Sequence, residues 1–88
     1  MALLDLLGRR WALRVLWELR YEELSFRELQ DACGQISPTV LNDRLRELRD
    51  GKLVALDPEL GYRLTALGSE LVEKFLPLMR WADRWARY

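Results

Sequence analysis

The clearest pattern of hydrophobic and polar positions lies in residues 37–54. Its leucines recur at spacings of four and three, which puts them on one stripe of a helix: Leu41, Leu45 and Leu48. Ser37 can accept a hydrogen bond from a free amide of the first turn, and Pro38 suits a first helical position that needs no N–H. Gly51 favours a helix end, so the pattern predicts a helix over residues 38–50 with a polar outer face.

Apolar residues are frequent near the start of the chain. They are too many for a helix that has one face buried and the other exposed to solvent. They are Leu3, Leu4, Leu6, Leu7, Trp11, Leu13, Val15, Leu16, Trp17 and Leu19. We therefore expect one first helix with two buried sides, of which one meets the domain core and the other a partner. Gly8 would allow a close approach or a small bend.

A second, short helix is predicted from a capping-box pattern, in which Ser25 and Glu28 can satisfy each other's end amides. It would run to about Cys33 with three side chains inward: Phe26, Leu29 and Cys33. Residues 34–36 then form a tight turn into the Ser37 cap. Helix, short turn and helix in this order are typical of a helix-turn-helix.

The residues after Gly51 change from a helical to a strand pattern. Two short apolar runs, 53–56 and 62–64, flank Asp57-Pro58 and Gly61, which predicts a β-hairpin, called a wing when it follows a reading helix.

A last helix is predicted to begin after the cap residue Thr65, with Glu70 and Lys74 as a favourable pair. Pro77 should kink or break it near its middle. Beyond Pro77, apolar residues recur at spacings of three and four: Leu78, Trp81, Ala82 and Trp85.

Chain length and amino-acid composition limit the kinds of protein that this sequence can encode. A chain of 88 residues predicts one domain, 1–88, and half of its residues are hydrophobic, so a compact fold that gains from self-association is expected. It has no histidine and one cysteine, Cys33, which we assign to core filling. We expect no enzyme, no metal and no cofactor, although carboxylate-only catalysis stays formally open. Without a leader or an apolar run of membrane length, we expect a cytoplasmic protein.

Charge gives no simple answer about nucleic acid, because 14 basic and 14 acidic residues cancel. Twelve of the basic residues are arginine, which favours bidentate contact with phosphate or guanine. A GC-rich genome or a thermophilic source explains the same bias equally well.

The order of these motifs resembles the HxlR-type family of winged helix-turn-helix transcription regulators, with single motifs shared by MarR-like and PadR-like relatives. The similar segments are residues 6–11, 25–29, 36–41, 44–48, 51–54 and 62–68. The resemblance implies a mainly α fold with a small β-hairpin, namely a three-helix core, a wing and a C-terminal dimerisation helix. It also implies a homodimer held by the first and last helices, which would place its reading helices in successive major grooves about 34 Å apart.

Two features differ from the family pattern. The wing turn is short and carries Asp57 and Glu59, which would repel phosphate and leave Arg63 as the only basic candidate there. Some relatives sense electrophiles through a cysteine ahead of the first-helix motif, a position that Cys33 does not match.

The candidate DNA contacts lie on the reading helix and around it. We assign Arg46 to a guanine edge, Asn42 to adenine and Thr39 to a thymine methyl group or a phosphate. Asp43 could accept from cytosine N4, orient a neighbouring arginine, or mark a face that no longer meets DNA. The remaining candidates are helix caps or phosphate contacts: Ser37, Pro38, Arg49, Arg27, Lys52 and Arg63.

The apolar residues of the terminal helices are assigned to packing and to the dimer interface. The predicted interface comprises Leu3, Leu7, Trp11, Leu78, Trp81 and Trp85, and Trp11 and Trp17 can also belong to the core or its seam with the last helix. A pocket for a flat small-molecule effector is the alternative role of the tryptophans. An effector would act at the dimer seam by changing the distance between the reading helices.

The sequence therefore favours a dimeric regulator that binds double-stranded DNA. A winged-helix module that has lost DNA and binds another protein is the alternative. The arginine-bearing, well-capped reading helix favours the regulator, whereas zero net charge, the acidic wing and Asp43 favour the interaction module.

Overall fold

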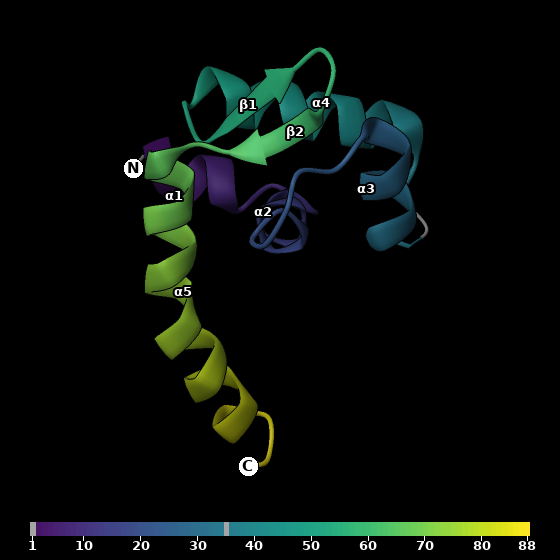
Figure 1. Cartoon of the computed structure of the whole chain (residues 1–88). Coiled ribbons are helices and arrows are strands. Elements are labelled where there is room, and N and C mark those ends of the chain that lie inside the picture. The colour runs from purple at the N-terminus through teal and green to yellow at the C-terminus, as the bar shows by residue number, and fades with distance from the viewer. Residues whose placement is uncertain (1, 35) are drawn as a thin grey trace.

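The computed structural model of this chain describes residues 2–34 and 36–88. In chain order the elements are α1 (Ala2–Leu7), α2 (Ala12–Glu18), α3 (Phe26–Ala32), α4 (Pro38–Asp50), β1 (Val54–Asp57), β2 (Gly61–Leu64) and α5 (Ala66–Trp85) (Figure 1). The predicted mainly helical fold with a small hairpin is confirmed. The middle of the predicted turn before α4, Gln35, lies outside the described residues.

The predicted single first helix is wrong, because the chain forms α1 and α2 with a break between them. The Gly8 amide closes α1 by donating to the Leu4 carbonyl at 2.8 Å. Trp11 then takes the left-handed conformation, with φ at 78°, and the chain starts a new helix in a different direction. Helix α2 buries Ala12, Val15 and Leu16, whereas α1 buries no residue of its own.

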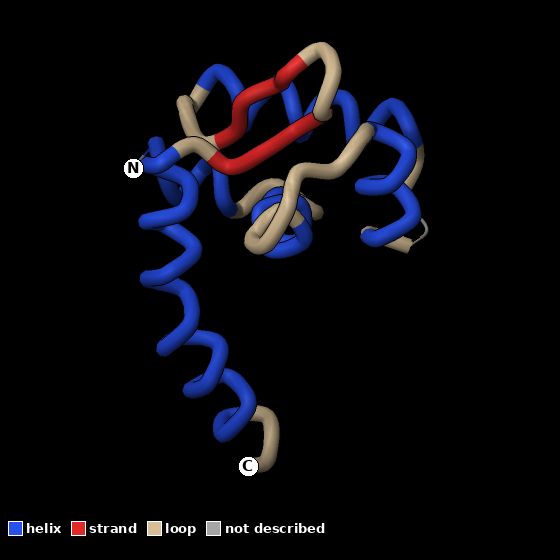
Figure 2. Tube along the Cα trace, in the orientation of Figure 1, coloured by secondary structure: helices blue, strands red, loops and turns tan. Residues whose placement is uncertain are grey.

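Helix α2 lies at the centre of the fold and packs against α3, α4 and α5 (Figure 2). The core is almost entirely aliphatic, and its largest fully buried side chains are Val15, Leu16, Leu29, Leu41, Leu45 and Leu48. Burial of about 1.5–3 kcal/mol per such side chain is the main force that holds three short helices together.

Both helix starts of the helix-turn-helix are capped as predicted. Ser25 Oγ accepts from the Glu28 amide at 3.1 Å, and Glu28 Oε1 accepts from the Ser25 amide at 2.9 Å. Ser37 Oγ accepts from the Val40 amide at 3.2 Å, with Pro38 in the first turn. These local hydrogen bonds fix where α3 and α4 begin.

The predicted hairpin is present, with β1 and β2 antiparallel and Val54 paired with Leu64. A further bridge joins Tyr62 to Leu24, which ties the segment before α3 to the wing. Gly61 has a φ of 104°, and a Cβ there would lie 2.5 Å from the Leu24 carbonyl oxygen. The wing is therefore attached to the body through β2, which contacts the segment before α3.

Helix α5 begins at the Thr65 cap as predicted, since Thr65 Oγ1 accepts from the Gly68 amide at 3.0 Å. Of the kink or break predicted at Pro77, the break is wrong, because α5 continues through Pro77 to Trp85. Pro77 and Glu73 are both exposed, so water can satisfy the Glu73 carbonyl that loses its amide partner. Figure 1 shows α5 leaving the body, with the C-terminus far from the wing.

Candidate nucleic-acid interface

Helix α4 turns one face into the core and the opposite face outward. Its leucine stripe is at most 1% exposed, which fixes the rotation of the helix. The predicted reading residues lie away from that stripe: Thr39, Asn42, Arg46 and Arg49 are exposed, and Asp43 is half-buried. The structure therefore brings these five side chains to one outward surface, which we call the reading face.

An ion pair joins two residues of the reading face. Arg46 Nη2 lies 3.2 Å from Asp43 Oδ1, one helical turn away, and donates a hydrogen bond to it. The Arg46 side chain keeps 64% of its surface exposed. Asp43 thus holds the guanidinium at the surface without covering it, and of its three predicted roles the orientation of an arginine matches this contact.

Arg44 is not part of the reading face. Its side chain is only 14% exposed, and its Nε lies 3.4 Å from Glu47 Oε2. This pair lies between the core stripe and the outward surface, so Arg44 supports helix packing. The basic side chains of this segment are therefore not all sorted to one side.

The remaining candidates surround α4. Ser37 and Pro38 serve first as the N-terminal cap, and both are exposed. Arg27 is exposed on α3. Lys52 is exposed just after α4 with a φ of 65°, and its carbonyl accepts from the Thr65 hydroxyl at 2.7 Å.

The wing contributes one basic side chain and a structured acidic turn. Arg63 is exposed on β2 opposite Ala55. Asp57 Oδ1 accepts from the amides of Glu59 at 2.8 Å and Leu60 at 3.1 Å. These two hydrogen bonds, with a smaller effect of Arg63, hold the pKa of Asp57 below its ordinary value. The Asp57 carboxylate thus shapes the turn, which agrees with the turn predicted at Asp57-Pro58.

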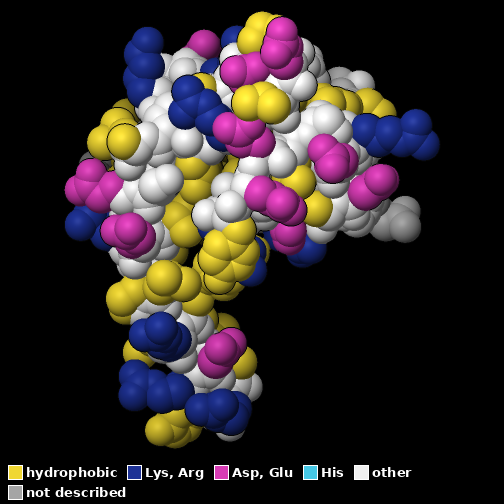
Figure 3. Space-filling view, viewed as in Figure 1, with side chains coloured by type: hydrophobic (Ala, Val, Ile, Leu, Met, Phe, Trp, Pro, Cys, Tyr) yellow, Lys and Arg dark blue, Asp and Glu magenta, His cyan; other side chains and the backbone are white. Residues whose placement is uncertain are grey.

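The residues predicted for the dimer interface divide into two groups. Leu3, Leu78, Trp81 and Trp85 are exposed, whereas Leu7 and Trp11 are half-buried against the core of their own chain. Trp81 and Trp85 stack with ring centroids 6.4 Å apart. Figure 3 shows hydrophobic side chains where α5 leaves the body and basic side chains toward its C-terminal end.

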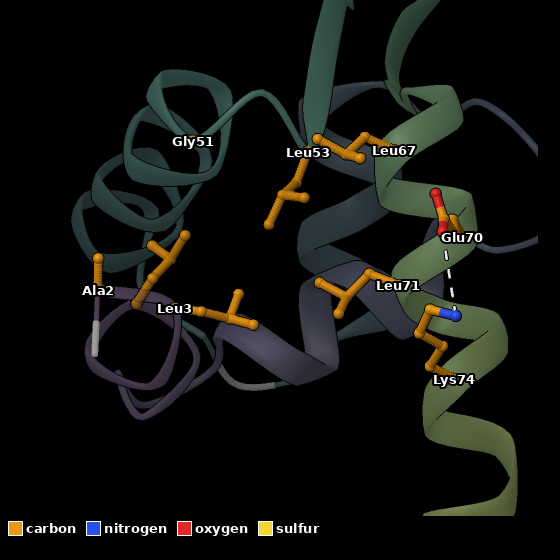
Figure 4. A pocket seen from close by; sticks show the side chains of 9 residues that line it. Ala2, Leu3, Gly51, Leu53, Leu67, Glu70, Leu71 and Lys74 are labelled. Carbon is orange, nitrogen blue, oxygen red and sulfur yellow. Dashed lines mark ion pairs between the residues drawn. The ribbon is translucent and has the colours of Figure 1, made fainter.

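A hollow of about 490 Å³ lies between α1, the end of α4 and the first half of α5 (Figure 4). Its lining is mostly aliphatic: Ala2, Leu3, Leu6, Gly51, Leu53, Leu67, Glu70, Leu71 and Lys74. At its edge Lys74 Nζ lies 3.9 Å from Glu70 Oε1. Sequence reasoning missed this site, although Leu67, Leu71 and Lys74 recur at helical spacing and so share a face.

Cys33 is buried, and burial raises the pKa of its thiol. Both findings agree with its assignment to core filling. Residues 2–34 and 36–88 contain no cluster of side chains arranged to hold a metal ion. None of the described helices is long and apolar enough to cross a membrane.

Comparison with known proteins identifies the family. Residues 6–88 match the HxlR-like helix-turn-helix family. Two relatives are from Bacillus subtilis: the HTH-type transcriptional regulators YvaP, 31% identical over 92% of this chain and 81% of its own length, and YodB, 31% identical over 91% and 77%. Rv3095 of Mycobacterium tuberculosis is 36% identical over 93% of this chain, which spans only 55% of that relative.

Solved structures show the same fold. Quinone-bound YodB from B. subtilis superposes with a TM-score of 0.87 and 30% identity, over 94% of this chain and 92% of that one. A possible HxlR family factor from Thermoplasma volcanium has a TM-score of 0.82 at 24% identity, over 97% and 82%. The winged helix-turn-helix architecture is thereby confirmed. The chain belongs to the HxlR-like helix-turn-helix family of transcriptional regulators, which are not enzymes.

Proposed function

We propose that this chain, as a single domain over residues 1–88, binds a near-palindromic operator as a homodimer through α4. The observation that carries the proposal is the reading face, on which polar side chains capable of addressing base edges stand opposite a fully buried leucine stripe. A capped helix of this length can lie in the major groove. Since regulators act at the chromosome, we infer a cytoplasmic location.

The roles proposed on the reading face follow from side-chain chemistry. Arg46 can donate two hydrogen bonds to guanine O6 and N7, Asn42 can pair with adenine N6 and N7, and Thr39 can contact a thymine methyl group or a phosphate. Arg49 lies on the same surface at the next turn, and Asp43 orients Arg46.

Phosphate contacts are proposed for side chains that flank the reading face. Arg27, Lys52 and Arg63 come from the helix before it, the segment after it and the wing, and all three are exposed. Ser37 and Pro38 lie at the N-terminal end of α4, where the helix dipole favours a phosphate.

Dimerisation is proposed through α1 and α5. Leu3, Leu78, Trp81 and Trp85 expose between 39% and 65% of their surface in a single copy. Exposed aromatic and aliphatic side chains gathered on one helix are typical of an interface. A second copy would cover them, and Leu7 and Trp11 would lie at the border between this interface and the core.

The first test is fluorescence anisotropy with the duplex upstream of the protein's own gene and with a scrambled duplex, titrated across salt. We expect tighter binding to the first duplex and a steep loss of affinity as salt rises. Arg46→Ala should remove about 1–3 kcal/mol of discrimination, whereas Arg87→Ala, at the far end of the chain, is the control. Failure of both duplexes to bind at low salt would contradict the proposal.

The alternative function is a protein-interaction module. It is favoured by zero net charge and by two acids in the wing, Asp57 and Glu59. It predicts that Arg46→Ala changes nothing on DNA, so the same titration separates the two functions.

A small-molecule effector is a further proposal. The solved YodB structure holds a quinone. In this chain the buried Cys33 is poorly placed to react with one, so an effector would bind without a covalent bond. The aliphatic hollow beside α1 has a size suited to such a ligand, and it borders Gly51 at the end of α4.

A further inference from the structure

The acidic residue on the reading face has no evident purpose if α4 only attracts DNA. A carboxylate near phosphates is repelled, and it lowers affinity for every duplex alike. Asp43 nevertheless stands one turn from Arg46, within 3.2 Å of its guanidinium. The pair is exposed, so in free protein it adds little stability. Any role it has in recognition therefore depends on which donors and acceptors it presents to a ligand.

The donors and acceptors that the pair leaves free define that ligand. One N–H of Arg46 Nη2 is directed to Asp43 Oδ1. A guanidinium has five N–H donors, so enough remain to reach both O6 and N7 of guanine. The second carboxylate oxygen of Asp43 remains an acceptor on a side chain that is 38% exposed. The pair as a whole thus presents donors and one acceptor side by side.

In the major groove this arrangement complements one pattern. Guanine offers the acceptors O6 and N7, and cytosine offers the N4 amino donor. Thymine offers O4, an acceptor that a carboxylate would repel, and adenine sets the acceptor N7 beside its N6 amino donor, so both bases are disfavoured at the cytosine position. The same carboxylate is repelled by the backbone of every sequence, and a cytosine amino group compensates for that repulsion without an acceptor beside it.

The geometry points to Asp43 and Arg46 as one specificity-determining unit, which reads a guanine together with an adjacent cytosine amino group in the operator half-site. This inference rests on the proposed function. Arg46 makes the guanine contact, while Asp43 both positions Arg46 and reads the cytosine.

The test is selection of bound duplexes from a random library by the chain of residues 1–88 and by three variants. Asp43→Asn keeps the shape of the side chain and an oxygen for Arg46, but replaces the second acceptor by an NH2 donor. We expect its preference to change away from cytosine toward a base that offers an acceptor at that position, by about tenfold in relative affinity. Arg46→Lys should keep the charge and lose the guanine preference.

Asp50→Asn is the matched control, because Asp50 is an exposed acid at the end of the same helix. Removal of its charge should raise affinity for selected and scrambled duplexes by the same factor and leave the selected sequence unchanged. Thermal unfolding and size-exclusion profiles identical to wild type would confirm that each variant is folded.

The outcomes distinguish a failure of the proposed DNA binding from a failure of the Asp43–Arg46 reading unit. If wild type enriches no sequence, the proposed function fails and this inference fails with it. If wild type enriches a motif and Asp43→Asn selects the same motif, the proposed function stands and the reading unit is wrong. A motif in which Asp43→Asn exchanges cytosine for a base that offers an acceptor, while Asp50→Asn keeps the cytosine, supports the unit.

Discussion

Helices α4 and α5 begin in the same way and end in different surroundings. Each starts at a hydroxyl cap, Ser37 or Thr65, and each carries an apolar stripe. The stripe of α4 is completely buried along the helix. In α5 the buried positions are Gly68 and Val72, and none of residues 73–88, all of which the structure describes, is buried.

The apolar stripe of α4 is covered within one copy of the chain, whereas the distal apolar residues of α5 are left exposed. The α4 stripe finds its partners in α2 and β1, so its rotation is fixed within one copy. The distal part of α5 carries tryptophans with no comparable cover in its own chain. The rotation of α4 is therefore fixed within one copy, whereas we propose that the second half of α5 packs against a second copy.

The largest expected effect comes from truncating the buried stripe. Leu45→Ala should lower the free energy of unfolding by about 2–5 kcal/mol, because Leu45 is 1% exposed and its removal leaves a cavity. Leu78→Ala makes the same chemical change on α5 at a residue that is 56% exposed. Urea unfolding of both variants, at protein concentrations low enough for monomers, should show little loss for Leu78→Ala. Equal losses would refute the comparison.

The second expected effect is on assembly. Replacing Trp81 and Trp85 together by alanine should weaken dimerisation by about 2 kcal/mol or more, which is about thirtyfold or more in the dissociation constant. Sedimentation velocity across a dilution series would measure it. Leu60→Ala, which removes an exposed leucine from the wing instead, should leave the dissociation constant unchanged. A double variant that dimerises like wild type would place the interface elsewhere.

The sequence predicted the α4 side of this comparison well because the signals there are local. The caps at Ser25 and Ser37, the leucine stripe and the wing punctuation each depend on residues a few positions apart. These features also place Thr39, Asn42 and Arg46 on the outward face.

The sequence predicted the terminal helices less well because their course depends on backbone choices that residue patterns do not reveal. A left-handed tryptophan, Trp11, ends the continuity of the first helix, yet tryptophan is not a residue that favours this conformation. Pro77 shows the opposite case, because a residue that often ends a helix lies inside α5. The loss of one hydrogen bond on an exposed surface was not enough to end the helix.

Within the candidate site, side-chain pairing was the part that spacing could not settle. Asp43 and Arg44 are neighbours in sequence, but one turns outward to Arg46 and the other sideways to Glu47. The wing shows the same limit, because Asp57 binds its own turn. The predicted contacts to DNA and to a second copy stay predictions.

A third effect concerns the point where α5 leaves the body. A Cβ on Gly68 would overlap the carbonyl oxygen of Leu53, a backbone atom that cannot swing aside. The overlap should cost about 1–3 kcal/mol, and alanine returns roughly 1 kcal/mol in helix propensity, so Gly68→Ala should lower the free energy of unfolding by up to about 2 kcal/mol. Thermal unfolding beside Ser69→Ala, an exposed neighbour, would measure the difference. A more stable Gly68→Ala variant would mean that α5 can shift away from Leu53 at no cost.

The smallest effect lies in the hairpin that joins α4 to α5. The amides of Glu59 and Leu60 hold the pKa of Asp57 below its ordinary value of about 4, so the folded state favours the charged carboxylate. Such a group stabilises the fold fully above its unfolded pKa, and the contribution is lost as pH falls through the folded pKa. Asp57→Asn keeps an acceptor oxygen but not the charge, so it should be less stable than wild type at pH 7 and should approach wild type below pH 4. Urea unfolding at both pH values would measure this convergence. A gap that persists in acid would mean that the turn depends on the shape of Asp57 and not on its charge.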